Sequence, residues 1–156
     1  MGFDLQRFID AQNGGESFNR ALNELRTGHK TSHWMWFVFP QIAGLGQSAM
    51  SRRYAIFSLE EARAYLVHPI LGPRLVECAQ ALLSHHGRSA SEILGEIDAV
   101  KLRSSMTLFA RAAQTASPSK PSLKDGFDGL DDATVFRQVL ERYFDGEADT
   151  ATERLL

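Results

Sequence analysis

Apolar residues recur three and four positions apart through most of this chain, which is the spacing of one face of an α-helix. The pattern is strongest over 70–83, where one face carries Leu71, Leu75, Cys78, Ala79 and Leu82. It returns at Leu102, Met106 and Phe109, and again at Val135, Phe136, Val139, Leu140 and Tyr143. No alternation of strand and helix patterns and no internal repeat is visible. We therefore predict a mainly α fold, a single compact multi-helix domain over 1–156.

Residues that favour helix ends mark several expected boundaries. Ser58 and Ser89 each precede a glutamate by three residues, which is the capping-box spacing at a helix start. Asp4 and Asp98 are expected to act as N-caps of two further helices. The last long helix is expected over 133–144.

The segment 34–39, WMWFVF, follows neither the helical nor the strand period. A run this short fits one short strand near 34–39 as well as a buried helical turn. Pro40 ends the segment, because the residue before a proline is biased away from helical angles. Gly44 and Gly46 follow, and we expect a non-helical turn there.

Residues 115–132, TASPSKPSLKDGFDGLDD, form the one loop-like segment of the sequence. About 18 residues without a helical pattern is long for a compact domain, so such a segment is either mobile or functional. We predict a mobile loop over 115–132.

Charge and composition exclude several classes of function. The formal net charge of −2 gives no strong nucleic-acid signal. No apolar stretch is long enough for a membrane span, and the first residues lack the pattern of a signal peptide. Cys78 is the only cysteine, and no metal-binding motif is present. We expect a cytoplasmic protein with no cofactor, no metal and no membrane partner; the oligomeric state stays open.

One group of residues combines aromatic rings with polar side chains, and its members are Lys30, Ser32, His33, Trp34, Trp36 and Gln41. An indole ring can stack on a base, a cation can bind phosphate, and an amide can read a base edge. If 34–39 is helical, His33 and Trp36 share a face, whereas an extended segment puts Trp34 and Trp36 on the side opposite His33. The alternative is that the aromatic side chains simply form core.

Two further groups could take part in the same site. Gly44 and Gly46 precede an expected short helix at 48–54 that begins at Ser48, and its first N–H groups suit an anion, although a plain turn explains them too. Arg52 could add affinity for phosphate. On a helix, Lys101 and Ser105 share a face with Asp98. A lysine beside a serine could activate a nucleophile or bind an anion; the alternative is an exposed ion pair between Asp98 and Lys101.

Five stretches in order resemble the bacterial family called domain of unknown function 1810: DLQRFIDAQ, ALNELRTGHKTSHWMWFVFPQIAGLGQS, YAIFSLEEARAYLVHPILGPRL, KLRSSMTLF and FRQVLERYFDGEADTAT. The resemblance implies a small, mainly helical protein without assigned catalytic residues. Some members carry the label calpastatin, but ten Phe and two Trp do not fit a disordered inhibitor. A weaker resemblance is to the NAD- and ADP-ribose-associated family.

These observations favour a domain that binds a nucleotide-like ligand, such as ADP-ribose or a derivative of NAD. We expect Trp34 or Trp36 to stack the base, and Lys30, Arg52 and the 44–48 loop to hold phosphate. Hydrolysis of an N-glycosidic bond, with Lys101 or His33 as the catalytic group, rests on analogy alone. The alternative is a non-catalytic protein-interaction module. A ligand site requires Lys30, His33, Gln41, Ser48 and Lys101 to converge on one concavity, whereas the alternative scatters them.

Overall fold

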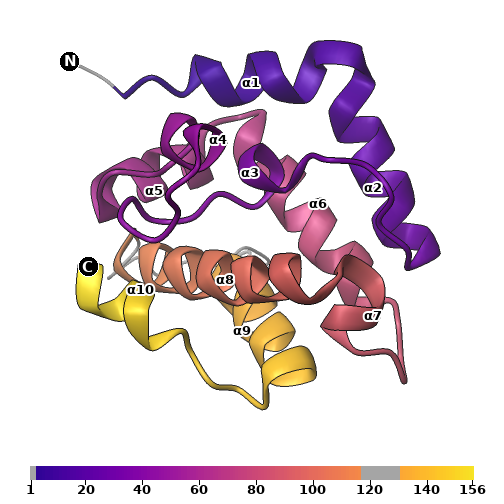
Figure 1. Cartoon of the computed structure of the whole chain (residues 1–156). Coiled ribbons are helices and arrows are strands. Elements are labelled where there is room, and N and C mark those ends of the chain that lie inside the picture. Colours follow the sequence, from indigo (N-terminus) through magenta and orange to yellow (C-terminus); the bar gives the residue numbers. More distant parts are fainter. Residues whose placement is uncertain (1–2, 117–130) are drawn as a thin grey trace.

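The structure, a computed structural model, describes residues 3–116 and 131–156. All the longer elements in these two ranges are helices, which confirms the predicted mainly α fold (Figure 1). In chain order they are α1 (Gln6–Asn13), the 3₁₀ turn η1 (Gly14–Glu16), α2 (Ser17–Thr27), α3 (Met35–Val38), α4 (Ala49–Arg53), α5 (Leu59–Val67), α6 (Leu71–Leu83), α7 (Ala90–Leu94), α8 (Glu96–Ala116), α9 (Asp131–Phe144) and α10 (Thr150–Leu155).

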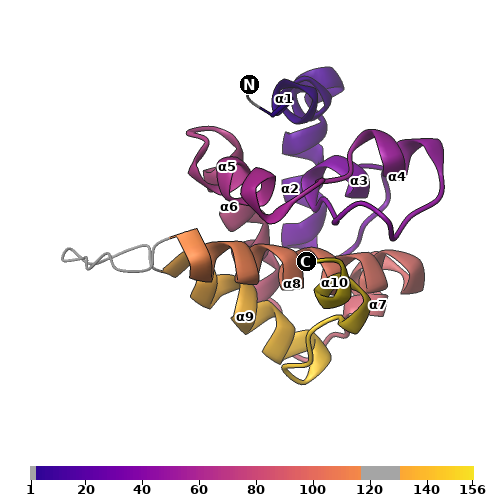
Figure 2. The ribbon, with the colours of Figure 1, turned by 90° about the vertical axis from the view of Figure 1, so that its left-hand side faces the viewer.

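Helix α8 runs across the molecule and packs against α5 on one side and α9 on the other (Figures 1 and 2). Four buried rings from four helices follow one another through the core. The ring centroids of Phe8 and Tyr65 lie 5.2 Å apart, those of Tyr65 and Phe109 5.2 Å, and those of Phe109 and Phe136 6.0 Å. These contacts join α1, α5, α8 and α9 into one hydrophobic core.

The serine caps form as the sequence predicts. Ser58 Oγ accepts from the backbone N–H of Glu61 over 3.1 Å. Ser89 forms the full capping box, accepting from Glu92 N over 3.0 Å while its own N–H donates to Glu92 Oε1 over 2.9 Å. Each cap satisfies N–H groups that the first helical turn cannot pair.

Two predicted aspartate caps are wrong. Helix α1 begins after Leu5, without a side-chain cap. Gly95, at φ 93°, ends α7, and its carbonyl accepts the first bond of α8, from Ala99 N. Asp98 therefore lies inside the first turn of α8, where its side chain is free to pair with other groups.

The segment 34–39 contains a single helical turn, α3, and the alternative of a short strand there is wrong. A non-helical stretch follows at Pro40 and continues to α4, as the proline and glycines predict. An isolated parallel bridge pairs Ile42 with Ile56, and Ile56 N donates to Gln41 O over 2.8 Å. The bridge ties the segment after α3 to the segment before α5.

The predicted loop at 115–132 is longer than the gap between the helices. Helix α8 extends to Ala116 and α9 begins at Asp131, two residues before the expected start at 133. Most of the predicted mobile loop, residues 117–130, lies outside the described residues. Within the described ranges, no helix has the length and apolar character needed to cross a membrane.

Candidate functional site

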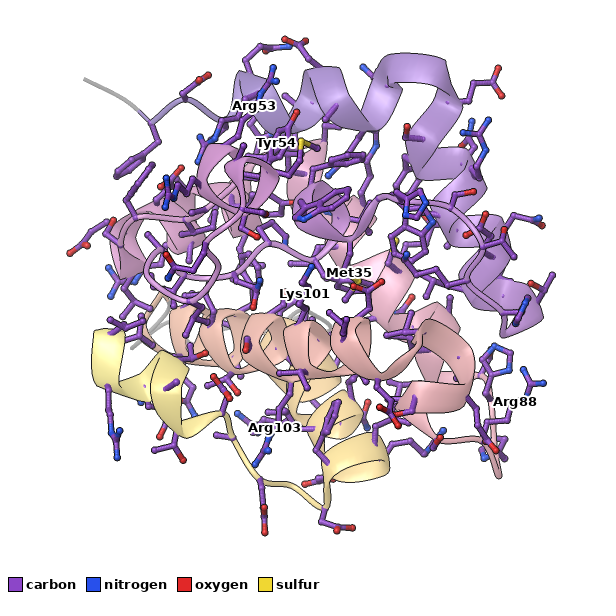
Figure 3. All side chains as sticks on the ribbon, in the orientation of Figure 1. Met35, Arg53, Tyr54, Arg88, Lys101 and Arg103 are labelled. Carbon is purple, nitrogen blue, oxygen red and sulfur yellow. The ribbon has the colours of Figure 1, made fainter. Side chains whose placement is uncertain are left out.

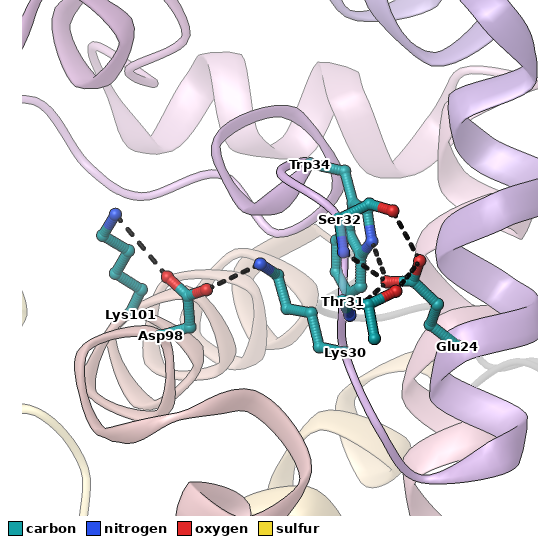
Figure 4. Close-up of polar contacts among 7 residues, drawn as sticks. All are labelled: Glu24, Lys30, Thr31, Ser32, Trp34, Asp98 and Lys101. Atoms are coloured by element: carbon teal, nitrogen blue, oxygen red, sulfur yellow. Dashed lines mark hydrogen bonds and ion pairs between the residues drawn. The ribbon is translucent and has the colours of Figure 1, made fainter.

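The Glu24 carboxylate organises the chain that leads into α3 (Figure 4). Its Oε1 accepts from Thr31 N over 2.9 Å, Ser32 N over 3.0 Å and Trp34 Nε1 over 2.8 Å. Its Oε2 accepts from the hydroxyls of Thr31 over 2.9 Å and Ser32 over 2.6 Å. Both carboxylate oxygens are thus saturated by a segment only seven to ten residues further along the chain.

The environment of Glu24 keeps its carboxyl group ionised. Burial by itself raises the pKa of Glu24, but the hydrogen bonds from Ser32, Thr31 and Trp34 outweigh that effect and lower the pKa from 4.5 to about 2. A carboxylate with this pKa and no free lone pair is poorly suited to proton transfer near neutral pH. Glu24 is therefore a structural anchor for residues 31–34.

Trp34 is a core residue. Its side chain is 1% exposed, its Nε1 is bound to Glu24, and its ring lies 6.4 Å from that of Phe39. No face of the ring is open, so Trp34 cannot stack a ligand as the sequence analysis expected. Ser32 is likewise engaged, because its hydroxyl donates to Glu24.

A second buried side chain fixes α3 from the other side. Gln12 Nε2, on α1, donates to the carbonyl of Phe37 over 2.7 Å. Glu24 thus anchors the residues just before α3, and Gln12 binds the carbonyl of Phe37 within α3. Trp36, between these two anchors, is held in place while its own side chain stays half-buried.

Two lysines from different parts of the chain share the Asp98 carboxylate (Figure 4). Lys30 Nζ lies 2.9 Å from Asp98 Oδ2, and Lys101 Nζ lies 3.7 Å from Asp98 Oδ1. Lys30 also lies 5.1 Å from the centroid of the Trp34 ring, and Lys101 5.4 Å from that of Trp36. Lys101 extends from α8 toward the turn that carries Met35 (Figure 3). One carboxylate for two ammonium groups leaves positive charge beside Trp36.

A cavity of about 80 Å³ lies next to Trp36, between the glycine-containing chain after α3 and the end of α4. We call it the Trp36 groove. Its lining residues are Trp36, Gln41, Ile42, Ala43, Gly44, Gly46, Ser51, Arg52, Tyr54, Ala55 and Phe57. Four predicted ligand residues therefore meet here, namely Trp36, Gln41, Gly44 and Gly46, together with Arg52. Lys101 does not line the groove, but its ammonium group contacts the ring of Trp36, which does.

The other predicted site residues do not line this cavity. His33 is exposed and lies before α3, so it does not share a helical face with Trp36. Ser48 caps α4, accepting from Ser51 N over 3.1 Å. Lys30 is held by Asp98, and Ser105 is fully buried with no hydrogen-bond partner within the described part of the chain. The expected convergence of Lys30, His33, Gln41, Ser48 and Lys101 is thus wrong as stated, since only Gln41 lines the groove and only Lys101 adjoins it.

The sequence analysis missed Glu24 and the pairing of Lys30 with Asp98. Glu24 lies on the buried face of α2 with Ala21 and Leu25, and a glutamate on an apolar face was the signal for a buried partner. Lys30 and Asp98 gave no comparable signal, because 67 residues separate them. Among the residues that the structure describes, no three His, Cys, Asp or Glu side chains form a group that could hold a metal ion.

Comparison with known proteins places the chain in a family. A crystal structure of the conserved hypothetical protein Rv1873 from Mycobacterium tuberculosis is 46% identical, with a TM-score of 0.84 over 99% of this chain and 96% of that one. A search of curated proteins finds no match. The family model described as protein of unknown function (DUF1810) matches residues 2–135. The chain therefore belongs to the DUF1810 family, as its sequence motifs indicated.

Proposed function

We propose that this chain binds a small nucleotide-like ligand, such as ADP-ribose or a derivative of NAD, at the Trp36 groove. The observation that carries the proposal is the position of Trp36. The backbone is anchored on both sides of Trp36, by Glu24 before it and by Gln12 after it, and the indole lines the groove with the Lys101 ammonium 5.4 Å from its centroid. A fixed, half-buried ring suits stacking on a planar heterocycle, at little cost in side-chain entropy.

The charges around the groove favour an anionic ligand. Lys101 shares Asp98 with the closer Lys30, so the negative charge of Asp98 is already balanced. Arg52 lines the groove and has neither an ion pair nor a side-chain hydrogen bond within the described residues. Two cations without full compensation next to one concavity are suited to a phosphate or diphosphate group.

Gln41 offers a way to recognise the heterocycle. Its backbone is fixed by the hydrogen bond from Ile56, the residue lines the groove, and its side-chain amide has no hydrogen-bond partner in the described part of the chain. An amide presents a donor and an acceptor side by side, which matches the edge of adenine or a carboxamide. We therefore expect Gln41 to discriminate between ligands that have this edge and those that do not.

Hydrolysis of an N-glycosidic bond is a separate question from binding. Such a reaction needs an acid–base or charge-stabilising group close to the reacting carbon. Asp98 is joined to Trp36 only through Lys101, and both of its carboxylate oxygens are engaged by lysines. The proposal accordingly claims binding, and product analysis decides whether turnover accompanies it.

Titration calorimetry with ADP-ribose, NAD, AMP and ribose 5-phosphate tests the proposal. We expect saturable binding of at least one phosphate-bearing nucleotide, weakened about tenfold or more by Trp36→Leu and by Arg52→Gln. Arg53→Gln is the matched control, because Arg53 is adjacent and exposed but does not line the groove. Absence of binding by all four compounds, or equal loss in the Arg53 control, contradicts the proposal and favours the protein-interaction alternative.

A further inference from the structure

Helix α10 lies against the glycine-containing wall of the Trp36 groove. In Figure 1 the end of α10 lies just below the chain that connects α3 and α4. A Cβ atom on Gly44 would lie 3.2 Å from Leu155 Cδ1 and 3.4 Å from Leu155 Cδ2, so the leucine packs directly on Gly44. Leu155 does not itself line the groove. It therefore supports the residues 43–47, here called the Gly44 loop, from a side other than the cavity.

The attachment of α10 to the rest of the molecule is mostly polar. Arg103, which extends from α8 (Figure 3), donates to the carbonyls of Glu147 over 2.9 Å and Ala148 over 3.1 Å, just before α10. The Asp149 N–H donates to Thr107 Oγ1 over 2.9 Å. Within α10 itself only Thr152 is buried. An element with so little buried apolar surface opens at a lower free energy than the core.

The size of the groove makes such an opening relevant to binding. Its volume of about 80 Å³ is well below the roughly 300 Å³ of the smallest common ligand pockets. Trp36 and Tyr54, on one side, are tied to the core. The Gly44 loop, on the other side, has no helical structure. Gly44 has φ 107°, a backbone conformation that only glycine adopts readily. Ala43 N–H donates to Ile56 O over 2.7 Å, so the part of this wall that can move is the part after Ala43, which Leu155 supports at Gly44.

We propose that α10 holds the Gly44 loop closed over the Trp36 groove, and that release of α10 opens the groove to its ligand. The first half of this proposal needs only the contacts described here. The second half rests on the proposed binding of a nucleotide-like ligand. If the closed arrangement dominates, the apparent affinity is reduced by the small fraction of open molecules, and weakening the closure increases the affinity.

The closure is tested without any ligand by Leu155→Ser, with Leu156→Ser as the matched control. Leu156 is also partly exposed, but the three atoms nearest to a Cβ on Gly44 all belong to Leu155. We expect Leu155→Ser to raise hydrogen exchange of amides in 43–47 at least threefold and to increase acrylamide quenching of tryptophan fluorescence. Trp34 is buried, so the added quenching reports on Trp36. Equal exchange and equal quenching in the two variants overturn the proposal.

A second variant guards against an effect of Leu155 on folding alone. Thr107→Val removes the acceptor for Asp149 N at the base of α10 without touching the Gly44 loop. It must raise exchange in 43–47 as Leu155→Ser does, while amides in α5 and α6 stay protected. Exchange that rises in α10 but not in 43–47 shows that the helix does not hold the loop, and the proposal is then wrong.

The ligand arm uses ADP-ribose and separates the two proposals. We expect Leu155→Ser to bind it at least threefold more tightly than the unmodified chain, through a higher association rate. Unchanged affinity together with an opened loop overturns the claim that α10 controls binding. If neither protein binds ADP-ribose or the other nucleotides while exchange and quenching both rise, the closure stands and the proposed function fails.

Discussion

The indole Nε1 of Trp34 lies 2.8 Å from Oε1 of Glu24, and this hydrogen bond joins the residue just before α3 to helix α2 inside the core. It makes Trp34 structural and leaves Trp36, two residues later, as the tryptophan that lines a cavity. The division of roles between the two indoles thus depends on one buried carboxylate.

Replacing Glu24 by Gln is expected to destabilise the protein by about 2–3 kcal/mol, because charge-assisted bonds are lost and an amide N–H₂ then faces N–H and O–H donors. Urea unfolding measures the loss. Glu141→Gln is the control, since Glu141 is exposed and should change stability by less than about 0.5 kcal/mol. A Glu24 variant as stable as this control contradicts the assigned role.

The contribution of Glu24 should depend on pH in a defined direction. Its folded-state pKa of about 2 lies below the ordinary value of 4.5, so its stabilisation is fully present above pH 4.5 and is lost as the pH falls toward 2. The full effect amounts to about 3 kcal/mol. The difference in unfolding free energy between the unmodified chain and Glu24→Gln should therefore shrink between pH 6 and pH 3. A difference that stays constant over this range would falsify the lowered pKa.

Two adjacent serines on α8 should respond in opposite ways to replacement by alanine. Ser105 Oγ is buried without a partner in the described part of the chain, so Ser105→Ala removes an unsatisfied group and should raise stability by up to about 1 kcal/mol. Ser104 Oγ donates to Asp149 Oδ2 over 3.2 Å, so Ser104→Ala should lower it by about 1 kcal/mol. Thermal unfolding of both variants checks the sign of each change. A large loss for Ser105→Ala shows that this hydroxyl has a partner after all.

Glycine at position 72 is expected to be required for the packing of α6 against α5. A Cβ there would lie 2.0 Å from the carbonyl oxygen of Leu66, which is a backbone atom, so the two segments would have to move apart. Gly72→Ala should therefore cost about 3 kcal/mol. Gly14→Ala is the comparison, because a Cβ at Gly14 meets nothing within 4 Å and the backbone has φ −64°. That variant should be neutral or slightly stabilising in the same chemical denaturation assay.

The sequence by itself determined the features that depend on near neighbours in the chain. The apolar face of 70–83 became the buried side of α6, and the Ser58 and Ser89 caps formed with glutamates three residues away. These interactions involve residues within one helical turn, so their spacing is visible without the fold. Family membership likewise followed from contiguous motifs.

Only the tertiary structure decided which side chains meet across the molecule. It set Trp34 in the core and Trp36 at the groove, although both are tryptophans in one short segment. It brought Lys30 to Asp98 and Leu155 to Gly44. Such contacts depend on how whole helices pack, and helix packing is fixed by the combined burial of many residues rather than by any local pattern. The composition of the candidate site could therefore be predicted in part, but its geometry could not.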